Sequence, residues 1–187
     1  MGGSAYAGSL MAGATVTNNQ ATFATPGAYV QLPSGLFGSY TAVSVEAWLT
    51  TGINNPSEYT RIFEFGSGTG SPMNCIEVSG PDIFYVSQFG DGTGVGCSSS
   101  VSFNSQTNLH VVVTVSEGEP TKMYINGVLQ CTIGHIFSQI PSPNYFYIGR
   151  SIYLSSHDGL IGSVDQLLVW GGALSADDVA SLYLQGK

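Results

Sequence analysis

The chain has 187 residues, which is enough for one domain with a sizeable hydrophobic core. Charged residues make up only 9% of the sequence and the formal net charge is −8, so the four scattered basic residues cannot neutralise the phosphates of a nucleic acid or attract an anionic membrane. No apolar run approaches roughly 18 residues, so we expect no membrane insertion. A glycan or a divalent cation is compatible with this composition.

The opening stretch, "MGGSAYAGSLMAG", contains no basic residue and no real hydrophobic segment, so it lacks the features of a secretory signal peptide. We expect residues 1–13 to form a flexible extension and residues 14–187 to form a single domain.

Apolar and polar residues alternate along most of the chain, a pattern typical of strands with one buried face. In chain order the predicted strands are "ATFAT", "YVQLP", "VSVEAWLT", "RIFEFG", "NCIEVSG", "DIFYVSQF", "SVSFN", "LHVVVTVS", "TKMYIN", "VLQCTI", "YFYIGR" and "SVDQLLVW". Within "KMYINGVLQC", Asn126 and Gly127 supply the two positive-φ residues of a type I′ turn, which predicts a hairpin of residues 122–126 and 128–133.

One stretch, "LSADDVASLY", predicts a helix. Ser175 and Asp178 have the spacing of a capping box, and Asp177 favours the positive N-terminal end of the helix. Val179 and Tyr183 then fall on one face together with Leu182, and this face would dock on the strands. A dozen short strands and one late helix predict an all-β, antiparallel two-sheet sandwich of the jelly-roll type.

Three cysteines occur, at positions 75, 97 and 131. Their spacing is not that of a metal site. It permits one disulfide in any of three pairings with a spare thiol, or three free thiols, and the sequence leaves these alternatives open.

The end of the chain carries a longer motif, "GLIGSVDQLLVWGGALSADDVASLY". With "YVQLP", "VSVEAWLT", "RIFEFGSG", "NLHVVVTVSEGEPTKMYINGVL" and "FYIGRS" before it, it resembles laminin-G-like and pentraxin-like domains of the concanavalin A-like lectin/glucanase superfamily. The resemblance covers about residues 14–185. It implies the jelly-roll fold, and the superfamily includes lectins, adhesion modules, hydrolases and passive spacers.

Two activities of that superfamily lack their motif in this chain. Its glycoside hydrolases use two carboxylates on one strand, usually in the pattern E-x-D-x-E. Every Glu in the predicted strands of this chain stands alone, so we expect that the protein is not an enzyme. Pentraxins hold a calcium pair with an acidic run after the strand that corresponds to "YFYIG". Arg150 and Ser151 occupy those positions here, which argues against pentraxin-type calcium binding.

Asp165 is a carboxylate within the apolar strand "SVDQLLVW", where it shares a predicted face with Leu167 and Val169 and would point partly inward. A buried carboxylate requires a cation or several donors. One interpretation is a hydrogen-bonded staple that uses backbone N–H groups, Arg61 or Arg150. The other is a structural Ca²⁺ completed by main-chain carbonyls.

Glu46, in "VSVEAWLT", is open to the same two interpretations. His110 precedes a strand that we expect to be packed, so we interpret it as a hydrogen-bonded structural histidine. Trp48 and Trp170 lie within predicted strands and are interpreted as packing residues.

Candidate ligand-binding residues lie in three loops. Arg150, Tyr153, His157 and Asp158 give a cation, an aromatic ring and a carboxylate within nine positions, a combination suited to a sugar. The alternative is an ordinary solvated loop. Two further candidates come from glycine-rich loops: Asn74 in "FGSGTGSPMN" and Asp91 in "FGDGTGVG". Resemblance to pentraxins implies that loops 66–74 and 150–158 are neighbours.

These observations predict a non-catalytic carbohydrate-binding or adhesion module of an extracellular or surface protein, with a glycan or a cell-surface protein as partner. The alternative is a structural domain for protein–protein interaction or assembly that binds no glycan. No cofactor is implied other than the calcium considered for Asp165 and Glu46. The sequence does not indicate the oligomeric state.

Overall fold

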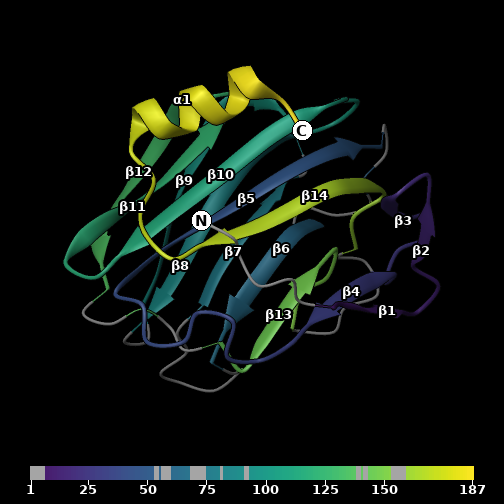
Figure 1. The fold of residues 1–187 in the computed structure, drawn as a ribbon, viewed down its shortest axis with the longest axis horizontal. Coiled ribbons are helices and arrows are strands. Elements are labelled where there is room, and N and C mark those ends of the chain that lie inside the picture. The colour runs from purple at the N-terminus through teal and green to yellow at the C-terminus, as the bar shows by residue number, and fades with distance from the viewer. Residues whose placement is uncertain are drawn as a thin grey trace.

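In a computed structural model of the chain, the described residues are 7–52, 55, 60–67, 75–80, 82–90, 93–137, 140, 143–152 and 159–187. They form two antiparallel sheets of seven strands each (Figure 1), which confirms the predicted sandwich. Sheet A consists, in spatial order, of β1 (Ser9–Met11), β4 (Tyr29–Leu32), β13 (Tyr145–Ile148), β6 (Thr60–Gly66), β7 (Cys75–Gly80), β8 (Ile83–Gly90) and β9 (Thr93–Ser102). Sheet B consists of β12 (Val128–Ile136), β11 (Glu119–Ile125), β10 (Leu109–Ser116), β5 (Ala42–Thr51), β14 (Gly162–Trp170), β3 (Gln20–Phe23) and β2 (Thr15–Thr17).

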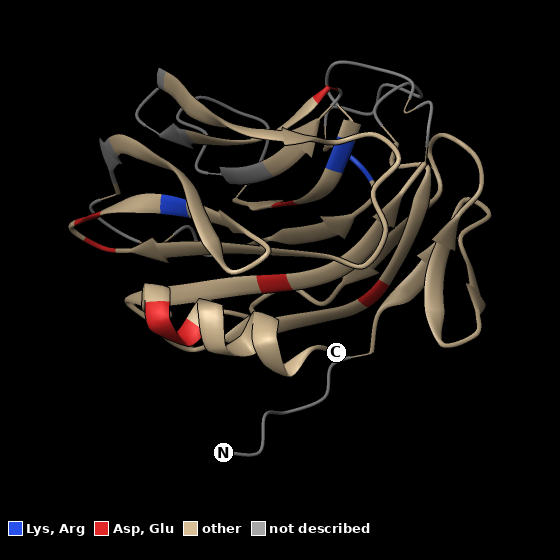
Figure 2. Ribbon diagram, turned by 90° about the horizontal axis from the view of Figure 1, so that it is seen from above, with Lys and Arg blue, Asp and Glu red and all other residues tan. Residues whose placement is uncertain are grey.

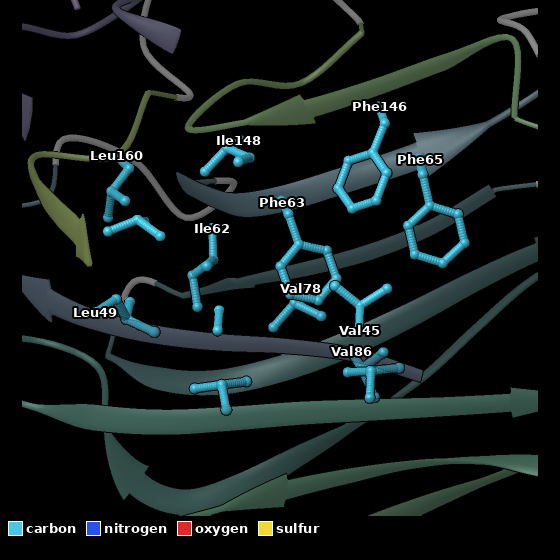
Figure 3. Packing of buried hydrophobic residues seen from close by; sticks show 14 of the residues in the cluster. Val45, Leu49, Ile62, Phe63, Phe65, Val78, Val86, Phe146, Ile148 and Leu160 are labelled. Atoms are coloured by element: carbon cyan, nitrogen blue, oxygen red, sulfur yellow. The ribbon is translucent and has the colours of Figure 1, made fainter. Parts of the chain in front are cut away.

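The core lies between the two sheets and is built by alternate residues of each strand. Figure 3 shows Phe63 and Phe65 of β6 with Phe146 of β13, and Val45 of β5 beside them. The rings of Phe65 and Phe146 have centroids 5.3 Å apart, and all four side chains are buried. The residues between these positions therefore point to the outer face of each sheet.

The hairpin predicted at Asn126 and Gly127 is confirmed. Both residues have positive φ, at 50° and 78°, and they join β11 directly to β12. The N-terminal stretch also contributes to the sandwich, because Ser9–Met11 pairs with β4 at one edge of sheet A.

The predicted helix is confirmed as α1 (Ala176–Gln185), which lies along the outer face of sheet B (Figures 1 and 2). The Ser175 side chain accepts a hydrogen bond from the backbone N–H of Asp178, whose carboxylate returns one to Ser175, so the capping box is complete. Val179 packs on Val112 and Tyr124 of sheet B. In the part of the chain that the structure describes, no helix combines the length and apolar character needed to cross a bilayer.

A disulfide between Cys97 and Cys131 joins β9 to β12. These are the edge strands of sheets A and B, so the bond closes one side of the sandwich. This pairing decides between the alternatives that the sequence left open.

Candidate functional site

The outer face of sheet A carries a group of aromatic and polar side chains. Val30 and Phe146 point into the core, so the residues beside them in β4 and β13 point outward. Tyr147 lies opposite Gln31 in the β4–β13 ladder and opposite Glu64 in the β13–β6 ladder. Gln31 is exposed and Tyr147 is half-buried, so both can reach a ligand on this face.

Arg150, just beyond β13, covers this face with its guanidinium group. Its Cζ atom lies 4.5 Å from the ring centroid of Tyr29 and 5.5 Å from that of Tyr147. The two rings meet edge to face with centroids 5.4 Å apart. We call Tyr29, Gln31, Tyr147 and Arg150 the tyrosine–arginine site. No described carboxylate forms a salt bridge with Arg150.

Glu64 fixes the backbone that follows Arg150. Its carboxylate is fully buried and accepts hydrogen bonds from Arg61 Nε at 2.9 Å, Ser151 Oγ at 3.1 Å and the backbone N–H of Ile152 at 2.9 Å. Arg61 also forms a β-bridge with Gly159. The two β6 residues therefore hold both ends of the segment that contains the predicted ligand-binding loop.

The residue before Arg150 is fixed as well. Gly149 donates its N–H to Ile62 O at 2.8 Å and accepts one from Leu160 at 3.1 Å. Its φ is +86°, and a Cβ there would lie 3.1 Å from Ala28 O and from the ring of Phe23. Only glycine fits this conformation and space without strain.

Among the ligand-binding candidates from the sequence, the structure places Arg150 in the tyrosine–arginine site. The others lie outside the described residues: Asn74, Asp91, Tyr153, His157 and Asp158. Sequence reasoning missed Tyr29 and Gln31, whose only signal was their place in the predicted strand "YVQLP".

The pairing of β6 with β7 also places Glu77 opposite Glu64. The two residues stand alone in the sequence, but adjacent strands bring their backbones together. Both oxygens of Glu64 are already engaged by Arg61, Ser151 and Ile152.

A second feature of sheet A is a shallow hollow of about 380 Å³ over β8 and β9. Its lining consists of Asp82, Ile83, Tyr85, Gly96, Cys97 and Ser98. β8 and β9 form the end of the sheet opposite to β4. Tyr85 therefore offers an aromatic side chain remote from the tyrosine–arginine site.

The prediction that Asp165 points partly inward is wrong. A β-bulge between Val164 and Gln166 shifts the alternation of β14, and Asp165 instead contacts Gln20 and Lys187 on the side of sheet B where α1 lies. Lys187 Nζ lies 2.9 Å from Asp165 Oδ1, and Gln20 donates to the same oxygen. The second oxygen, Oδ2, is buried without a hydrogen-bond partner among the described residues.

The partners expected for Asp165 are corrected by the same placement. Arg61 belongs to β6, and Arg150 follows β13, both in sheet A. Asp165 is in sheet B, so neither arginine can reach it across the core.

Glu46 lies on the outer face of sheet B, and its carboxylate is almost fully buried. His110 Nε2 lies 3.0 Å from one oxygen, and Trp170 Nε1 donates to the other at 2.9 Å. Burial alone would raise the pKa of Glu46, but these hydrogen bonds and the charge of His110 hold it below its ordinary value. The structural role predicted for His110 is confirmed.

The described residues contain no group of three or more His, Cys, Asp or Glu side chains able to hold a metal ion. Oxygen ligands of a hard cation near Asp165 would therefore have to include amide or main-chain carbonyl groups.

A family model described as the concanavalin A-like lectin/glucanases superfamily matches residues 23–180. The chain belongs to the concanavalin A-like lectin/glucanase superfamily. No curated protein sequence matches it significantly.

Solved structures share this superfamily fold at low sequence identity. Domain 4 of AbnA, an extracellular arabinanase of Geobacillus stearothermophilus in complex with arabinotriose, has a TM-score of 0.65 and 17% identity, with 96% of this chain and 81% of that one covered. Trypanosoma rangeli sialidase in complex with 2,3-difluorosialic acid has a TM-score of 0.71 and 16% identity, with 93% and 29% covered. A botulinum neurotoxin type C structure, whose cell entry depends on two ganglioside molecules, has a TM-score of 0.68 and 14% identity, with 96% and 46% covered. The chain thus spans less than half of the last two, and the likeness shows the fold alone.

Proposed function

We propose that this chain is a non-catalytic carbohydrate-binding module whose ligand lies on the outer face of sheet A. The observation that carries the proposal is the guanidinium of Arg150, which lies against the rings of Tyr29 and Tyr147 beside the exposed amide of Gln31. Sugars present apolar C–H faces and hydroxyl groups, and a site of aromatic rings with a few fixed polar groups matches both.

The described residues that flank the predicted ligand-binding loop 150–158 support this choice of site. Glu64 fixes Ser151 and Ile152, which follow Arg150, and Arg61 bridges to Gly159, so described residues on both sides of residues 153–158 are attached to β6. We propose that this loop, with loop 66–74, borders the bound sugar. The similar structures were determined with arabinotriose or a sialic acid derivative, which is consistent with a sugar ligand.

The proposal that the module is not an enzyme rests on the state of Glu64. A glycosidase needs one carboxylate free to attack or activate water and a second one able to donate a proton. Glu64 is fully buried, and its two carboxylate oxygens accept hydrogen bonds from Arg61, Ser151 and Ile152, so it is unsuited to either role.

An extracellular or surface location is proposed from the disulfide between Cys97 and Cys131, because such bonds persist mainly in oxidising compartments. In that setting the module would attach a larger protein to a glycan or to a glycosylated surface protein. The low charge density, visible in Figure 2 as few red and blue segments, suits recognition of hydroxyl groups.

A glycan array followed by calorimetry on the best binder tests the proposal. Tyr147→Ala should weaken binding by about 1–3 kcal/mol, since the ring is an aromatic anchor of the site. Tyr153→Ala should do the same if loop 150–158 borders the sugar. Tyr85→Ala, in the remote hollow, is the matched control. If only the Tyr85→Ala control loses binding, the glycan site lies over β8 and β9 instead. If the protein binds no glycan at all, the proposal is refuted.

One observation favours the alternative of a protein-interaction domain. Val128 and Leu129 at the β11–β12 hairpin and Leu184 of α1 are exposed apolar side chains, at 60%, 47% and 84% of their full accessibility. Exposed apolar side chains such as these can form a contact with another protein. Size-exclusion chromatography with light scattering tests self-association, and a concentration-dependent dimer abolished by Leu129→Ser would support it.

A further inference from the structure

Some of the basic residues of this chain form salt bridges with described acidic side chains, and others do not. Among its four basic residues, Arg61 is paired with Glu64 and Lys187 with Asp165. Arg150 forms no salt bridge with a described carboxylate, although acidic residues outnumber basic ones by twelve to four. Within the part of the chain that the structure describes, its guanidinium contacts the rings of Tyr29 and Tyr147.

We propose that Arg150 binds the carboxylate of an acidic sugar, so that the ligand class is saccharides containing a uronic or sialic acid residue. This inference rests on the proposed carbohydrate-binding function and adds the chemical class of the ligand. A guanidinium presents five N–H donors in a planar fork that matches a carboxylate in two parallel hydrogen bonds. No described carboxylate forms a salt bridge with Arg150, so within this part of the chain the donors are open to the carboxylate of a ligand.

The surroundings of Arg150 strengthen such a bond. The side chain is half-buried against Tyr29 and Tyr147, so an anion that reaches it leaves part of the solvent. Attraction between opposite charges is stronger there than at a fully exposed site. Gln31, exposed on the same face, offers an amide to the neighbouring hydroxyl groups of the same sugar.

The backbone of Arg150 is fixed before any ligand arrives. Gly149 is hydrogen-bonded to Ile62 and Leu160 on one side, and Ser151 and Ile152 are bonded to Glu64 on the other. A preformed site loses less conformational entropy on binding. Lys122, the remaining basic residue, lies in β11 of sheet B, whereas Tyr29 and Tyr147 belong to sheet A, which makes it a suitable control.

The chain contains only two arginines, so an NMR experiment can follow each one separately. Sodium glucuronate is titrated into the protein while the two Nε–Hε signals are recorded, with glucose and sodium chloride as parallel titrations. We expect the Arg150 signal to move with glucuronate in a saturable manner and to stay in place with glucose and with salt. The Arg61 signal, from a buried ion pair, should remain still throughout. Equal movement with glucose or with sodium chloride would overturn the inference.

Binding of paired oligosaccharides gives the second measurement. The wild type should bind 3′-sialyllactose or an oligouronate roughly tenfold or more tightly than lactose or the neutral counterpart, the scale of one charged hydrogen-bonded pair. Arg150→Gln should lose this preference, Arg150→Lys should keep a smaller part of it, and Lys122→Gln should keep it whole.

The two proposals fail in different ways. Suppose that Tyr147→Ala weakens binding of a neutral sugar but the wild type does not prefer the acidic sugar of a pair. Carbohydrate binding is then supported, and the proposed role of Arg150 is refuted. If neither the acidic nor the neutral sugar of any pair binds and the Arg150 Nε–Hε signal does not move, both proposals are refuted. A preference for the acidic sugar that survives in Arg150→Gln would place anion recognition at another residue.

Discussion

Glu46 and His110 form a buried hydrogen-bonded pair on the outer face of sheet B, with His110 Nε2 3.0 Å from Glu46 Oε1. Trp170 of β14 donates to the other oxygen, so the carboxylate of β5 is held from the strands on both sides. Tyr183 of α1 stacks over Trp48 and His110 with ring centroids 6.0 Å and 5.9 Å away. The pair therefore links three strands and the helix that packs on them.

Removal of the Glu46 carboxylate should destabilise the domain. Glu46→Ala leaves the donors of His110 and Trp170 without an acceptor in a buried place, so we expect the free energy of unfolding to fall by about 2–4 kcal/mol. Urea denaturation at neutral pH measures this. Glu119→Ala removes an exposed carboxylate from β11 and should change stability by at most about 0.5 kcal/mol. An equal effect of the two substitutions would contradict the structural role of Glu46.

The lowered pKa of Glu46 predicts a dependence of stability on pH. The folded state keeps this carboxylate charged below its ordinary pKa of 4.5, whereas the unfolded chain protonates it there. The stabilisation is thus complete above that value and is lost as the pH falls through the pKa of the folded state. Asp178, whose pKa is lowered by its hydrogen bonds with Ser175, acts in the same direction. In an Asp178→Asn background, Glu46→Gln should flatten the loss of unfolding free energy below pH 4.5. Parallel pH profiles with and without Glu46 would refute the assignment.

Local patterns in the sequence were sufficient for the elements themselves. The alternation in "LHVVVTVS", the turn at Asn126 and Gly127 and the capping box of Ser175 and Asp178 each act within a few residues, and the structure contains all three. The face of Asp165 could not be obtained this way, because a single bulge residue reverses the alternation after it and leaves no clear mark in the sequence.

Long-range pairing accounts for what the sequence did not predict about the site. Composition of the loop was enough to single out Arg150. Its contact with Tyr29 depends on the pairing of β4 with β13, and the bond from Ser151 to Glu64 joins residues 87 positions apart. The choice of Cys97 and Cys131 as disulfide partners depends in the same way on which edge strands meet.

The disulfide should contribute substantially to stability. Cys97 and Cys131 are 34 positions apart, and a cross-link that closes a loop of this length in the unfolded chain is expected to stabilise the folded state by about 3–4 kcal/mol. Urea denaturation with and without a reductant measures the difference. The Cys97→Ser/Cys131→Ser variant should match the reduced wild type and ignore the reductant, while Cys75→Ala should respond as the wild type does. Equal stability of the oxidised and reduced protein would contradict the prediction.

Glu64 should be more sensitive to substitution than any exposed acidic residue. Glu64→Gln removes the negative charge that Glu64 places beside the buried guanidinium of Arg61, which is expected to cost about 3–5 kcal/mol. It also weakens the bonds that fix Ser151 and Ile152, so chymotrypsin should cleave after Tyr153 faster than in the wild type. Glu119→Gln is the control for both measurements. Unchanged stability together with unchanged cleavage would show that β6 does not anchor this loop.

Asp165 offers the sharpest test of whether the domain holds calcium. Its Oδ1 accepts from Gln20 and pairs with Lys187, while Oδ2 is buried without a described partner. Asp165→Ala should lower the free energy of unfolding by about 2–4 kcal/mol whether or not an ion binds, because Gln20 and Lys187 lose their acceptor.

Removal of calcium by a chelator distinguishes the two interpretations of Asp165. If Oδ2 ligates a structural ion, EDTA should lower the melting temperature of the wild type, added Ca²⁺ should restore it through binding linkage, and Asp165→Ala should respond to neither. If the carboxylate is a hydrogen-bonded staple, which we favour because Gln20 and Lys187 already engage it, EDTA should leave the wild-type melt unmoved while Asp165→Ala still lowers it. Gln20→Ala should then reproduce part of that loss. A variant that melts like the wild type would refute both interpretations.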